Sequence, residues 1–292
     1  MLLAVPNFSE GRDTTLIEEI STAFATGAAL LDTHSDTVHN RTVLTLSGPF
    51  ESLAGALVNG ARACAEAIDM RRHEGAHPCI GALDVCPVVW LRAEDREAAH
   101  GEALEAARGI AAEAHVPVFL YGELASDPSR RERAFFRAGG LAELHRRVES
   151  GELRPDVGPA GLHPTAGATL VTARPPIAAF NVELEGADLE ATREIADRLR
   201  ESGGGLPGVR ALGIDLGDGR TQVSTNVHDP IAIPLAEVVQ RVRELAAPRD
   251  ARPASAEIVG LVPEASLEGL PEDLPLPGFD PARHVIERRV RA

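Results

Sequence analysis

The 292-residue chain is 44% hydrophobic and 25% charged, a globular composition with room for two ordinary units or one large one. Its formal net charge of −15 argues against a general binder of nucleic acids or anionic membranes. All 29 basic residues are arginine, which excludes covalent catalysis through a lysine Schiff base.

The first half of the chain predicts the order strand, helix, strand, strand, helix, strand. Asp13 is a plausible N-cap, because apolar residues recur at helical spacing directly after it. The strand candidates of this half are residues 2–8, 28–32, 41–48 and 81–91, and its second helix candidate is 51–68. A further helix is then predicted over 95–114 and a further strand over 116–123.

The second half repeats this order of elements. Asp188 is the candidate N-cap of its first helix, and Pro234 suits the first position of its second helix. Gly217-Asp218-Gly219 lies between two strand candidates and predicts a hairpin turn. The strand candidates of this half are residues 178–186, 209–216, 221–227 and 255–263.

A doubled order of this kind is typical of two ferredoxin-like, split β-α-β units, so we predict an α+β fold with helices packed on a sheet in each subdomain. The stretch 150–170 is rich in Gly and Pro and is interpreted as the junction. We therefore assign residues 1–175 to the first subdomain and residues 176–292 to the second. The Pro-rich end of the chain, from about residue 263, is expected to run over the surface.

Residues 73–77 read HEGAH, which matches the H-E-x-x-H pattern of a zinc metalloprotease helix. Such a site needs both histidines one turn apart on a continuous helix, so that both nitrogens reach one metal. Gly75 weakens a helix by about 1 kcal/mol relative to alanine, and Pro78 pushes His77 out of the helical region. We therefore expect a turn-like loop, in which His77 is either a proton shuttle or a hydrogen-bonded loop residue. No metal is expected, and a zinc hydrolase is the minor alternative.

The pattern H-P-x-x-G-A occurs twice, at residues 77–82 and 163–168. Glycines leave backbone N–H groups approachable in such loops, which suits polar or anionic ligands. Cys79 lies two residues after His77, and an extended segment would place both side chains on the same side. This spacing leaves a cysteine nucleophile activated by His77 as a further alternative.

Eight stretches, in order over nearly the entire chain, resemble the glutamate formimidoyltransferase (formiminotransferase) family. They are VPNFSEGR at 5–12, LLD…HNRTV at 30–43, IDMRRHEGAHPCIGALDVCP at 68–87, VPVFLYGE at 116–123, HPTAGAT at 163–169, AFNVEL at 179–184, QVSTN at 222–226 and EIVGLVP at 257–263. The resemblance covers the transferase domain. We expect no room for the cyclodeaminase domain that is fused to it in some animal proteins.

The resemblance implies an enzyme of histidine catabolism and one-carbon metabolism that moves a formimino group from N-formimino-glutamate to tetrahydrofolate. Tetrahydrofolate is then a co-substrate, and some members use 5-formyltetrahydrofolate as a formyl donor to glutamate. The resemblance also implies that His77 is catalytic. The attacking folate nitrogen loses a proton and the departing glutamate nitrogen gains one, and one imidazole can serve both steps as general acid and base. The alternative from another class is a non-catalytic homologue that binds folate or an amino acid.

A carboxylate beside His77 would orient the ring and favour its protonated form. Asp32, Asp36 and Asp84 are the candidates, although each could instead cap a turn. Arg41 is a candidate for binding a substrate carboxylate, with a surface ion pair as the alternative.

The predicted substrate site combines the matching stretches with the Gly-rich loop. We expect folate in the groove between the two units, with loop 163–169 lining it and the pteridine near His77. Arg174 would offset the repulsion between an acidic protein and the anionic tail of folate. The predicted binding residues are Asn7, Asn40, Arg41, His163, Pro164, Thr165, Gly167, Ala168, Thr169, Arg174 and Asn181.

Three positions depart from the family pattern. Ala76 and Cys79 replace an acidic residue and an arginine beside the catalytic position, and His34 stands where the family tends to have an aspartate. If the missing arginine binds a substrate carboxylate, affinity for a glutamate-bearing substrate is lower here, unless Arg71 or Arg72 compensates.

The three cysteines, at positions 64, 79 and 86, form no C-x-x-C pair, and no apolar stretch reaches membrane-spanning length. We therefore expect a cytoplasmic protein whose partners are small molecules, without nucleic-acid or membrane partners. A homodimer is left open.

Overall fold

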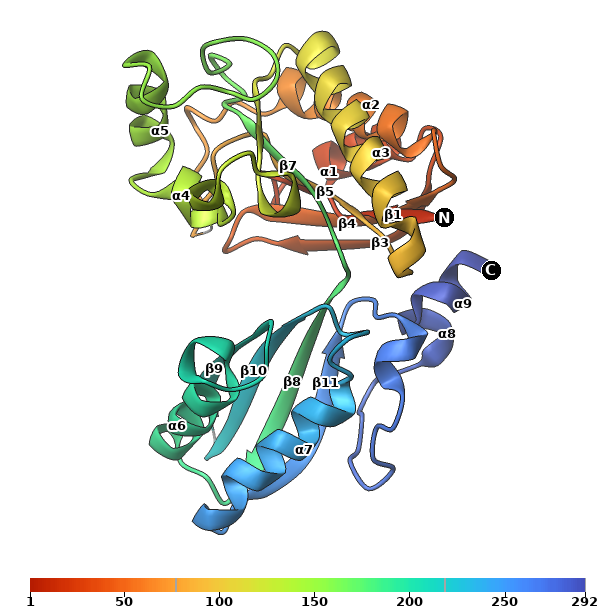
Figure 1. Ribbon diagram of the computed structural model, residues 1–292, viewed down its shortest axis with the longest axis vertical. Coiled ribbons are helices and arrows are strands. Elements are labelled where there is room, and N and C mark those ends of the chain that lie inside the picture. The colour runs from red at the N-terminus through yellow and green to blue at the C-terminus, as the bar shows by residue number, and fades with distance from the viewer. Residues whose placement is uncertain (77, 218, 292) are drawn as a thin grey trace. The chain divides into compact units, whose positions relative to one another are not determined.

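Two sheets, each with helices packed on it, organise the described part of the chain, which is residues 1–76, 78–217 and 219–291 (Figure 1). In this computed structural model the first unit, Met1–Arg174, holds a seven-stranded sheet, and the second unit, Pro175–Ala292, holds a four-stranded sheet. The predicted α+β class with two subdomains is confirmed.

The first sheet is mixed and has the order β3, β4, β1 with β2, β5, β7, β6. Strands β5, β7 and β6 run parallel, and the other neighbours run antiparallel. Helices α1 (Thr14–Phe24) and α2 (Leu53–Ala67) connect the antiparallel strands in the predicted split β-α-β order. The strands are β1 (Leu2–Ala4), β2 (Asn7–Phe8), β3 (Ala29–Asp36), β4 (Arg41–Gly48), β5 (Leu83–Val89), β6 (Val118–Leu120) and β7 (Thr169–Arg174).

The predicted strand 2–8 is two short strands, β1 and β2, which corrects that expectation. Pro6 stands between them and has no N–H group to donate to a neighbouring strand. The adjacent backbone groups still bond across the break, since Val5 N–H donates to Pro87 O (3.0 Å) and Leu44 N–H donates to Pro6 O (3.0 Å). The interruption therefore leaves the strand order intact.

The two first helices begin in different ways. Asp13 caps α1 as predicted, and its carboxylate accepts the N–H groups of Thr15 and Leu16 at 3.1 Å. At α2 the cap comes from another helix: buried Glu102 on α3 (Arg96–Gly109) accepts the N–H groups of Glu51 (3.0 Å) and Ala54 (2.6 Å). A carboxylate at a helix N-terminus complements the helix dipole, so α3 both packs on α2 and stabilises its start.

The stretch 150–170 does not separate the units, which corrects its interpretation as the junction. It leads into β7, which pairs in parallel with both β5 and β6, so the chain must return to the first sheet before it leaves the unit after Arg174. Two helices that the sequence did not predict precede it. They are α4 (Arg133–Arg137) and α5 (Gly140–Glu149).

The second sheet is antiparallel throughout, with the order β11, β8, β10, β9. Asp188 caps its first helix as predicted, because its side chain accepts Ala191 N–H at 2.8 Å. Pro234 stands at the N-cap, one residue earlier than expected, and Asp218 of the predicted hairpin turn lies outside the described residues. The elements are β8 (Ile177–Glu185), α6 (Leu189–Leu199), β9 (Val209–Gly217), β10 (Arg220–His228), α7 (Leu235–Ala246), β11 (Arg252–Val259), α8 (Pro281–His284) and α9 (Ile286–Arg291).

Helices α1, α2 and α3 cover one face of the first sheet with the main core, which includes Leu44 and Leu46 of β4. A smaller core lies on the opposite face, where Phe119, Phe136 and Leu170 pack together at the β5–β7–β6 end beneath α4 and α5. The rest of that opposite face, over β3, β4 and β2, carries half-buried and exposed side chains. We call this part the open face of the first sheet.

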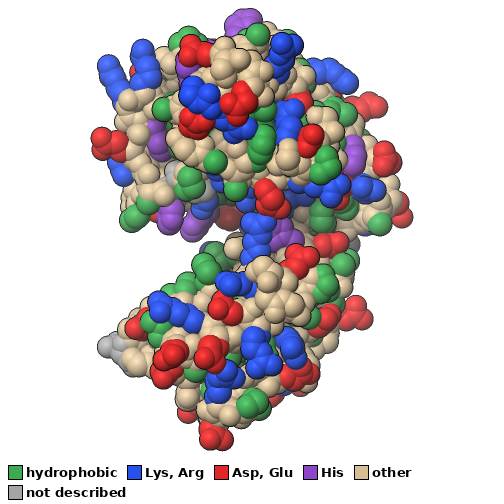
Figure 2. Space-filling model, turned by 60° about the vertical axis from the view of Figure 1, so that its left-hand side comes forward, with side chains coloured by type: hydrophobic (Ala, Val, Ile, Leu, Met, Phe, Trp, Pro, Cys, Tyr) green, Lys and Arg blue, Asp and Glu red, His purple; other side chains and the backbone are tan. Residues whose placement is uncertain are grey.

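Figure 2 shows Arg (blue) and Asp or Glu (red) side chains interspersed on the face that it draws. Of the helices that the structure describes, none has both the length and the apolar character needed to cross a bilayer.

Candidate active site

The open face of the first sheet gathers several of the predicted residues. Residues that pair directly across strands point to the same face. Asn7 pairs with Val43, Asp32 with Thr45 and Asp36 with Arg41, so these side chains share one face with alternate residues of β4. Strand register extends the same face to β7, where Val85 pairs with Leu170 and Arg174 lies four residues farther along. The register thus places Asn7, Asp32, Asp36, Arg41 and Arg174 on one face of the first sheet.

Arginine side chains gather around this face. Arg41 is half-buried, its pKa is lowered by burial, and its charge interacts with those of Asp36, Asp84, Arg133 and Arg137. The Nε atom of Arg41 is fully buried and has no hydrogen-bond partner. A buried N–H donor without a partner is costly in a folded protein, so this atom is a candidate to bind a ligand.

Arg133 and Arg137, one helical turn apart on α4, extend this group of cations. Arg137 forms an ion pair with the buried carboxylate of Asp84, which also accepts Ile80 N–H at 2.7 Å. Burial lowers the pKa of Arg174 to about 10, and the charge of Arg133 acts in the same direction. Burial likewise raises the pKa of Tyr121, against the influence of the charges of Arg133, Arg174 and Arg137. We call Arg41, Arg133, Arg137 and Arg174 the arginine cluster.

The turn between β3 and β4 is fixed by Asn40. This residue is buried and has a left-handed backbone (φ 48°), a conformation that asparagine tolerates better than most residues. Its side chain accepts Gly11 N–H (2.9 Å), donates to Glu74 O (3.0 Å) and lies 3.4 Å from His73 Nδ1. Asn40 therefore connects three loops and is structural in these contacts.

Residues 73–76 form a loop and no helix, as predicted for HEGAH, and they are held against the β3–β4 turn. Ala76 N–H donates to Val38 O at 3.1 Å. A Cβ atom on Gly75 would lie 2.4 Å from His39 O, so only glycine fits here. His77 itself lies outside the described residues, and the segment that leads to it is placed by these contacts.

The loops that carry the two H-P-x-x-G-A motifs are bonded to each other. Ala82 N–H donates to Ala166 O (2.9 Å), and Ala168 N–H donates to Ile80 O (3.0 Å). Two glycines make this close approach possible: a Cβ on Gly81 would lie 2.0 Å from Ala168 O, and one on Gly167 would lie 2.2 Å from Ile80 O. The repeated motif is thus a pair of interlocked loops at the start of β5 and β7.

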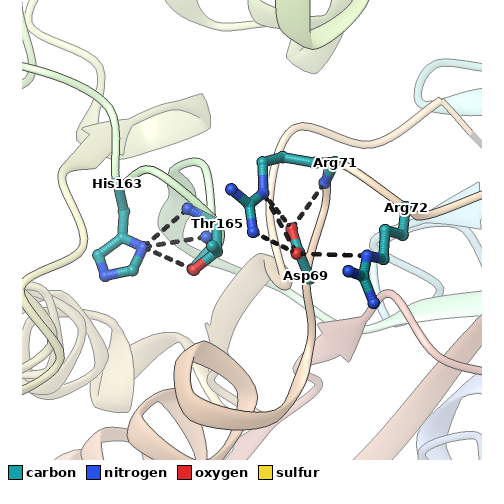
Figure 3. A network of polar contacts seen from close by, with 6 residues as sticks. Asp69, Arg71, Arg72, His163 and Thr165 are labelled. Carbon is teal, nitrogen blue, oxygen red and sulfur yellow. Dashed lines mark hydrogen bonds and ion pairs between the residues drawn. The ribbon is translucent and has the colours of Figure 1, made fainter.

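His163 is held in one tautomer by its own loop. Its Nδ1 accepts the N–H groups of Ala166 (3.0 Å) and Thr165 (3.3 Å), which leaves Nε2 to carry the hydrogen of the neutral ring. Figure 3 shows His163 and Thr165 beside Asp69, whose carboxylate binds Arg71 at 2.7 Å and Arg72 at 4.0 Å. Arg71 and Arg72, the candidates to compensate for the arginine that Cys79 replaces, are therefore both exposed and paired with Asp69.

The Asp36 carboxylate binds a histidine that the sequence analysis did not single out. Its Oδ2 lies 2.8 Å from His39 Nδ1, and its Oδ1 accepts the N–H groups of Val38 and His39, both at 2.8 Å. The backbone N–H and the ring of His39 lower the pKa of Asp36 to about 2. Asp36 is thus ionised at neutral pH.

The remaining predicted residues occupy varied places. Asn7 donates to Val5 O (2.9 Å), and Thr169 Oγ1 donates to Leu83 O (2.8 Å). Pro164 is exposed and Ala168 is buried. Asn181 belongs to the second unit, where its amide donates to Glu257 at 3.1 Å.

Cys79 is half-buried, and burial raises the pKa of its thiol. A raised pKa keeps the sulfur protonated at neutral pH and works against a nucleophilic role. Within residues 1–76, 78–217 and 219–291, His, Cys, Asp and Glu side chains form no group of three or more that could hold a metal ion.

Sequence reasoning missed His39, Arg133, Arg137 and Tyr121. Arg133 and Arg137 have the i, i+4 spacing that places two side chains on one helix face, and this was the available signal. His39 gave a weaker signal, since it lies three residues after Asp36 in a turn.

We expect the protein to lose stability as the pH falls below about 6.5. Burial is the main cause that lowers the pKa values of His73 and His163 below 6.5. Between the folded and unfolded pKa values the unfolded chain binds more protons, so stability is full above the unfolded value and declines on acidification. Asp36 and Asp69, with pKa values of about 2, do not titrate in this range.

The measurement is the thermal unfolding midpoint between roughly pH 7.5 and pH 5. The wild-type midpoint should fall across this range, and a double variant, His73→Gln with His163→Gln, should show a flatter profile. His145→Gln, at an exposed position on α5, is the matched control. A double variant with the wild-type slope would contradict the assignment to these two rings.

Comparison with known proteins gives two family matches. The formiminotransferase domain, N-terminal subdomain, matches residues 1–174, and the formiminotransferase domain matches residues 179–269. A glutamate formimidoyltransferase of Streptococcus pyogenes serotype M1 is 33% identical over 290 residues, which cover 98% of this chain and 97% of that protein.

Two further relatives are also named as formimidoyltransferases. A glutamate formimidoyltransferase of Thermoplasma acidophilum is 35% identical over 292 residues, covering 98% of this chain and 96% of that protein. A formimidoyltransferase-cyclodeaminase of Rattus norvegicus is 38% identical over 272 residues, which cover 90% of this chain and 50% of that protein.

Proposed function

Because the chain belongs to the formiminotransferase family, we propose that it transfers a formimino group from N-formimino-glutamate to tetrahydrofolate and releases glutamate. The same membership makes the chain a transferase enzyme. Tetrahydrofolate is the co-substrate in this proposal. A cytoplasmic setting in histidine catabolism belongs to the proposal as well.

The arginine cluster is the observation that carries the proposal. In a chain with a net charge of −15, Arg41 of β4 and Arg174 of β7 lie on the same face of the first sheet, and the charge of Arg133 on α4 acts on both of them. Arg137, on the same helix, is paired with Asp84. Guanidinium groups bind carboxylates with charge-assisted, often bidentate hydrogen bonds. N-formimino-glutamate carries two carboxylates and the tail of folate carries others, so both proposed substrates have the anionic groups that this cluster suits.

The unpartnered, buried Nε of Arg41 supports a ligand at the same place. A substrate carboxylate would satisfy this donor, and the nearby charges of Arg133 and Arg137 would add attraction. We assign the interlocked loop 163–169 to the folate side of the site, because backbone hydrogen bonds to residues 80–82 hold it in place beside the segment that leads on from His77.

The chemistry needs a group that moves protons. The folate amine forms a bond to the amidine-like carbon, a tetrahedral intermediate results, and the bond from that carbon to the glutamate nitrogen breaks. His77 is proposed as the general acid and base, which takes the proton from the folate nitrogen and gives one to the glutamate nitrogen. Hydrogen bonds hold residues 73–76, which directly precede His77, and this supports the proposal.

The test is incubation of the protein with N-formimino-glutamate and tetrahydrofolate, with 5-formimino-tetrahydrofolate as the measured product. Arg133→Gln should raise the KM for N-formimino-glutamate by roughly 10-fold or more, since a charged hydrogen bond contributes about 1.5–3 kcal/mol. The kcat should change less, because a carboxylate remote from the reacting carbon is bound equally in the ground and transition states. Arg41→Gln should act in the same direction.

Arg131→Gln is the matched control, because Arg131 is an exposed arginine two residues before α4 and outside the cluster. A binding-only homologue would bind folate without forming product. A zinc hydrolase would contain stoichiometric metal that is lost in His73→Ala. Equal KM values for Arg133→Gln, Arg41→Gln and Arg131→Gln would reject the cluster as the carboxylate site.

A further inference from the structure

The pair formed by Asp36 and His39 has the geometry of a carboxylate that orients an imidazole. The distance from Asp36 Oδ2 to His39 Nδ1 is 2.8 Å, and two backbone N–H groups hold the other carboxylate oxygen. An ionised carboxylate can only accept hydrogen bonds, so His39 Nδ1 carries a hydrogen. Nε2 is then the nitrogen that can take up or release a proton, as in other carboxylate–histidine pairs.

This pair lies against the segment that leads to His77. Val38 O accepts Ala76 N–H at 3.1 Å, and the His39 carbonyl is so close to Gly75 that a Cβ there would lie 2.4 Å away. The side chain of Asn40 adds a bond to Glu74 O at 3.0 Å. The β3–β4 turn and loop 73–76 therefore form one packed unit, and His39 is part of it.

The ring of His39 is also accessible. Its side chain is 47% exposed, so a small molecule can reach it. Asp36 pairs in register with Arg41, whose buried Nε has no hydrogen-bond partner. A substrate whose carboxylate binds Arg41 would therefore lie close to this turn.

We propose that His39, oriented by Asp36, is a second proton-transfer residue of the transferase reaction. This inference rests on the proposed function. The folate N–C bond forms as the N–H proton leaves, and the C–N bond to glutamate breaks as its nitrogen gains a proton. One proton is released and one is consumed, so the reaction balances with two imidazoles as well as with one. His39 Nε2 handles one of these transfers, and His77 handles the other.

The charged and titratable groups at this turn come from several neighbouring segments. Arg12 donates to Thr37 O at 2.9 Å, so its guanidinium lies at the same turn. The groups are Asp36 on the turn itself, Arg41 on β4, Glu10 and Arg12 after β2, and His73 and Glu74 on the packed loop.

The experiment measures transfer from N-formimino-glutamate to tetrahydrofolate by the wild type, His39→Ala, His39→Gln and Asp36→Asn. His39→Ala should lower kcat by roughly 10²-fold, with KM values changed much less, because proton transfer is felt in the transition state. Added imidazole should restore part of the rate of His39→Ala, which loss of a purely structural contact would not allow. One limb of the pH–rate profile should disappear in both His39 variants, and Asp36→Asn should lower kcat by a smaller factor.

His145→Gln is the matched control, since His145 Nε2 binds Glu149 at 2.9 Å on the exposed side of α5. It should keep the wild-type rate and profile. If the wild type transfers the group while both His39 variants keep its kcat and pH profile, this inference is wrong and the proposed function stands. If the wild type forms no product at any pH, the proposed function fails, and this inference fails with it.

Discussion

Replacing His77 by alanine is expected to lower kcat by roughly two to four orders of magnitude, because general acid–base catalysis contributes about that much. Folate binding should change little, since the imidazole acts on protons that move in the transition state. The measurement pairs single-turnover kinetics with equilibrium binding of folate to the same preparation. The unfolding midpoint of the variant shows whether its fold is kept.

His73→Ala separates this prediction from its rivals. His73 touches Asn40 at 3.4 Å and its Nε2 is buried, so its loss should reduce stability more than chemistry. A zinc site in HEGAH would instead make both substitutions abolish activity together. If His77→Ala keeps most of the wild-type kcat, His77 is not the general acid or base.

The parts of the fold that the sequence predicted depend on local signals. Asp13 and Asp188 each precede an amphipathic run, and both accept N–H groups of the first helical turn. These signals, with alternating strand patterns, were sufficient for the doubled β-α-β order. Local patterns also predicted α2, but they gave no sign of the carboxylate at its start, which belongs to Glu102 on a helix more than forty residues later in the chain.

Local sequence patterns also predicted part of the site. Arg41, Asn40 and the Gly-rich loops lie in stretches that resemble the family, and strand register then places several of them on one face. Helix α4 has only five residues, and it owes its position to Phe136, which packs 5.2 Å from Phe119 in a small core. A five-residue helix is too short to show a periodic pattern, so the i, i+4 spacing of Arg133 and Arg137 did not by itself assign them to the site.

The pairing of Asp36 with His39 depends on the shape of a turn. Asn40 adopts a left-handed backbone, and this closes the turn so that the carboxylate of Asp36 reaches the ring three residues later. Sequence reasoning gave Asp36 as one of three candidate carboxylates beside His77, together with Asp32 and Asp84. The structure shows the Asp36 carboxylate bonded to His39, and His77 lies outside the described residues.

Gly167→Ala is expected to destabilise the first unit by roughly 2–5 kcal/mol and to lower activity with it. The residue has a left-handed backbone (φ 72°), and a Cβ would lie 2.2 Å from Ile80 O. A strained backbone contributes about 1–3 kcal/mol and overpacking a similar amount. Ile80 O cannot retreat freely, because it accepts Ala168 N–H at 3.0 Å.

Gly81→Ala isolates the steric part of this effect. Its backbone is in an ordinary region, yet its Cβ would lie 2.0 Å from Ala168 O, so the two loops must separate to admit it. Gly161→Ala is the matched control in the same segment, because no atom lies within 4 Å of its Cβ position.

Thermal unfolding should show a midpoint lower by roughly 5–15 °C for Gly81→Ala and Gly167→Ala, using about 2–4 °C per kcal/mol for a unit of this size. Equal midpoints for all three variants would mean that the interlocked loops do not hold the site together. A loss of kcat with a normal midpoint would place these loops in the chemistry and not only in the fold.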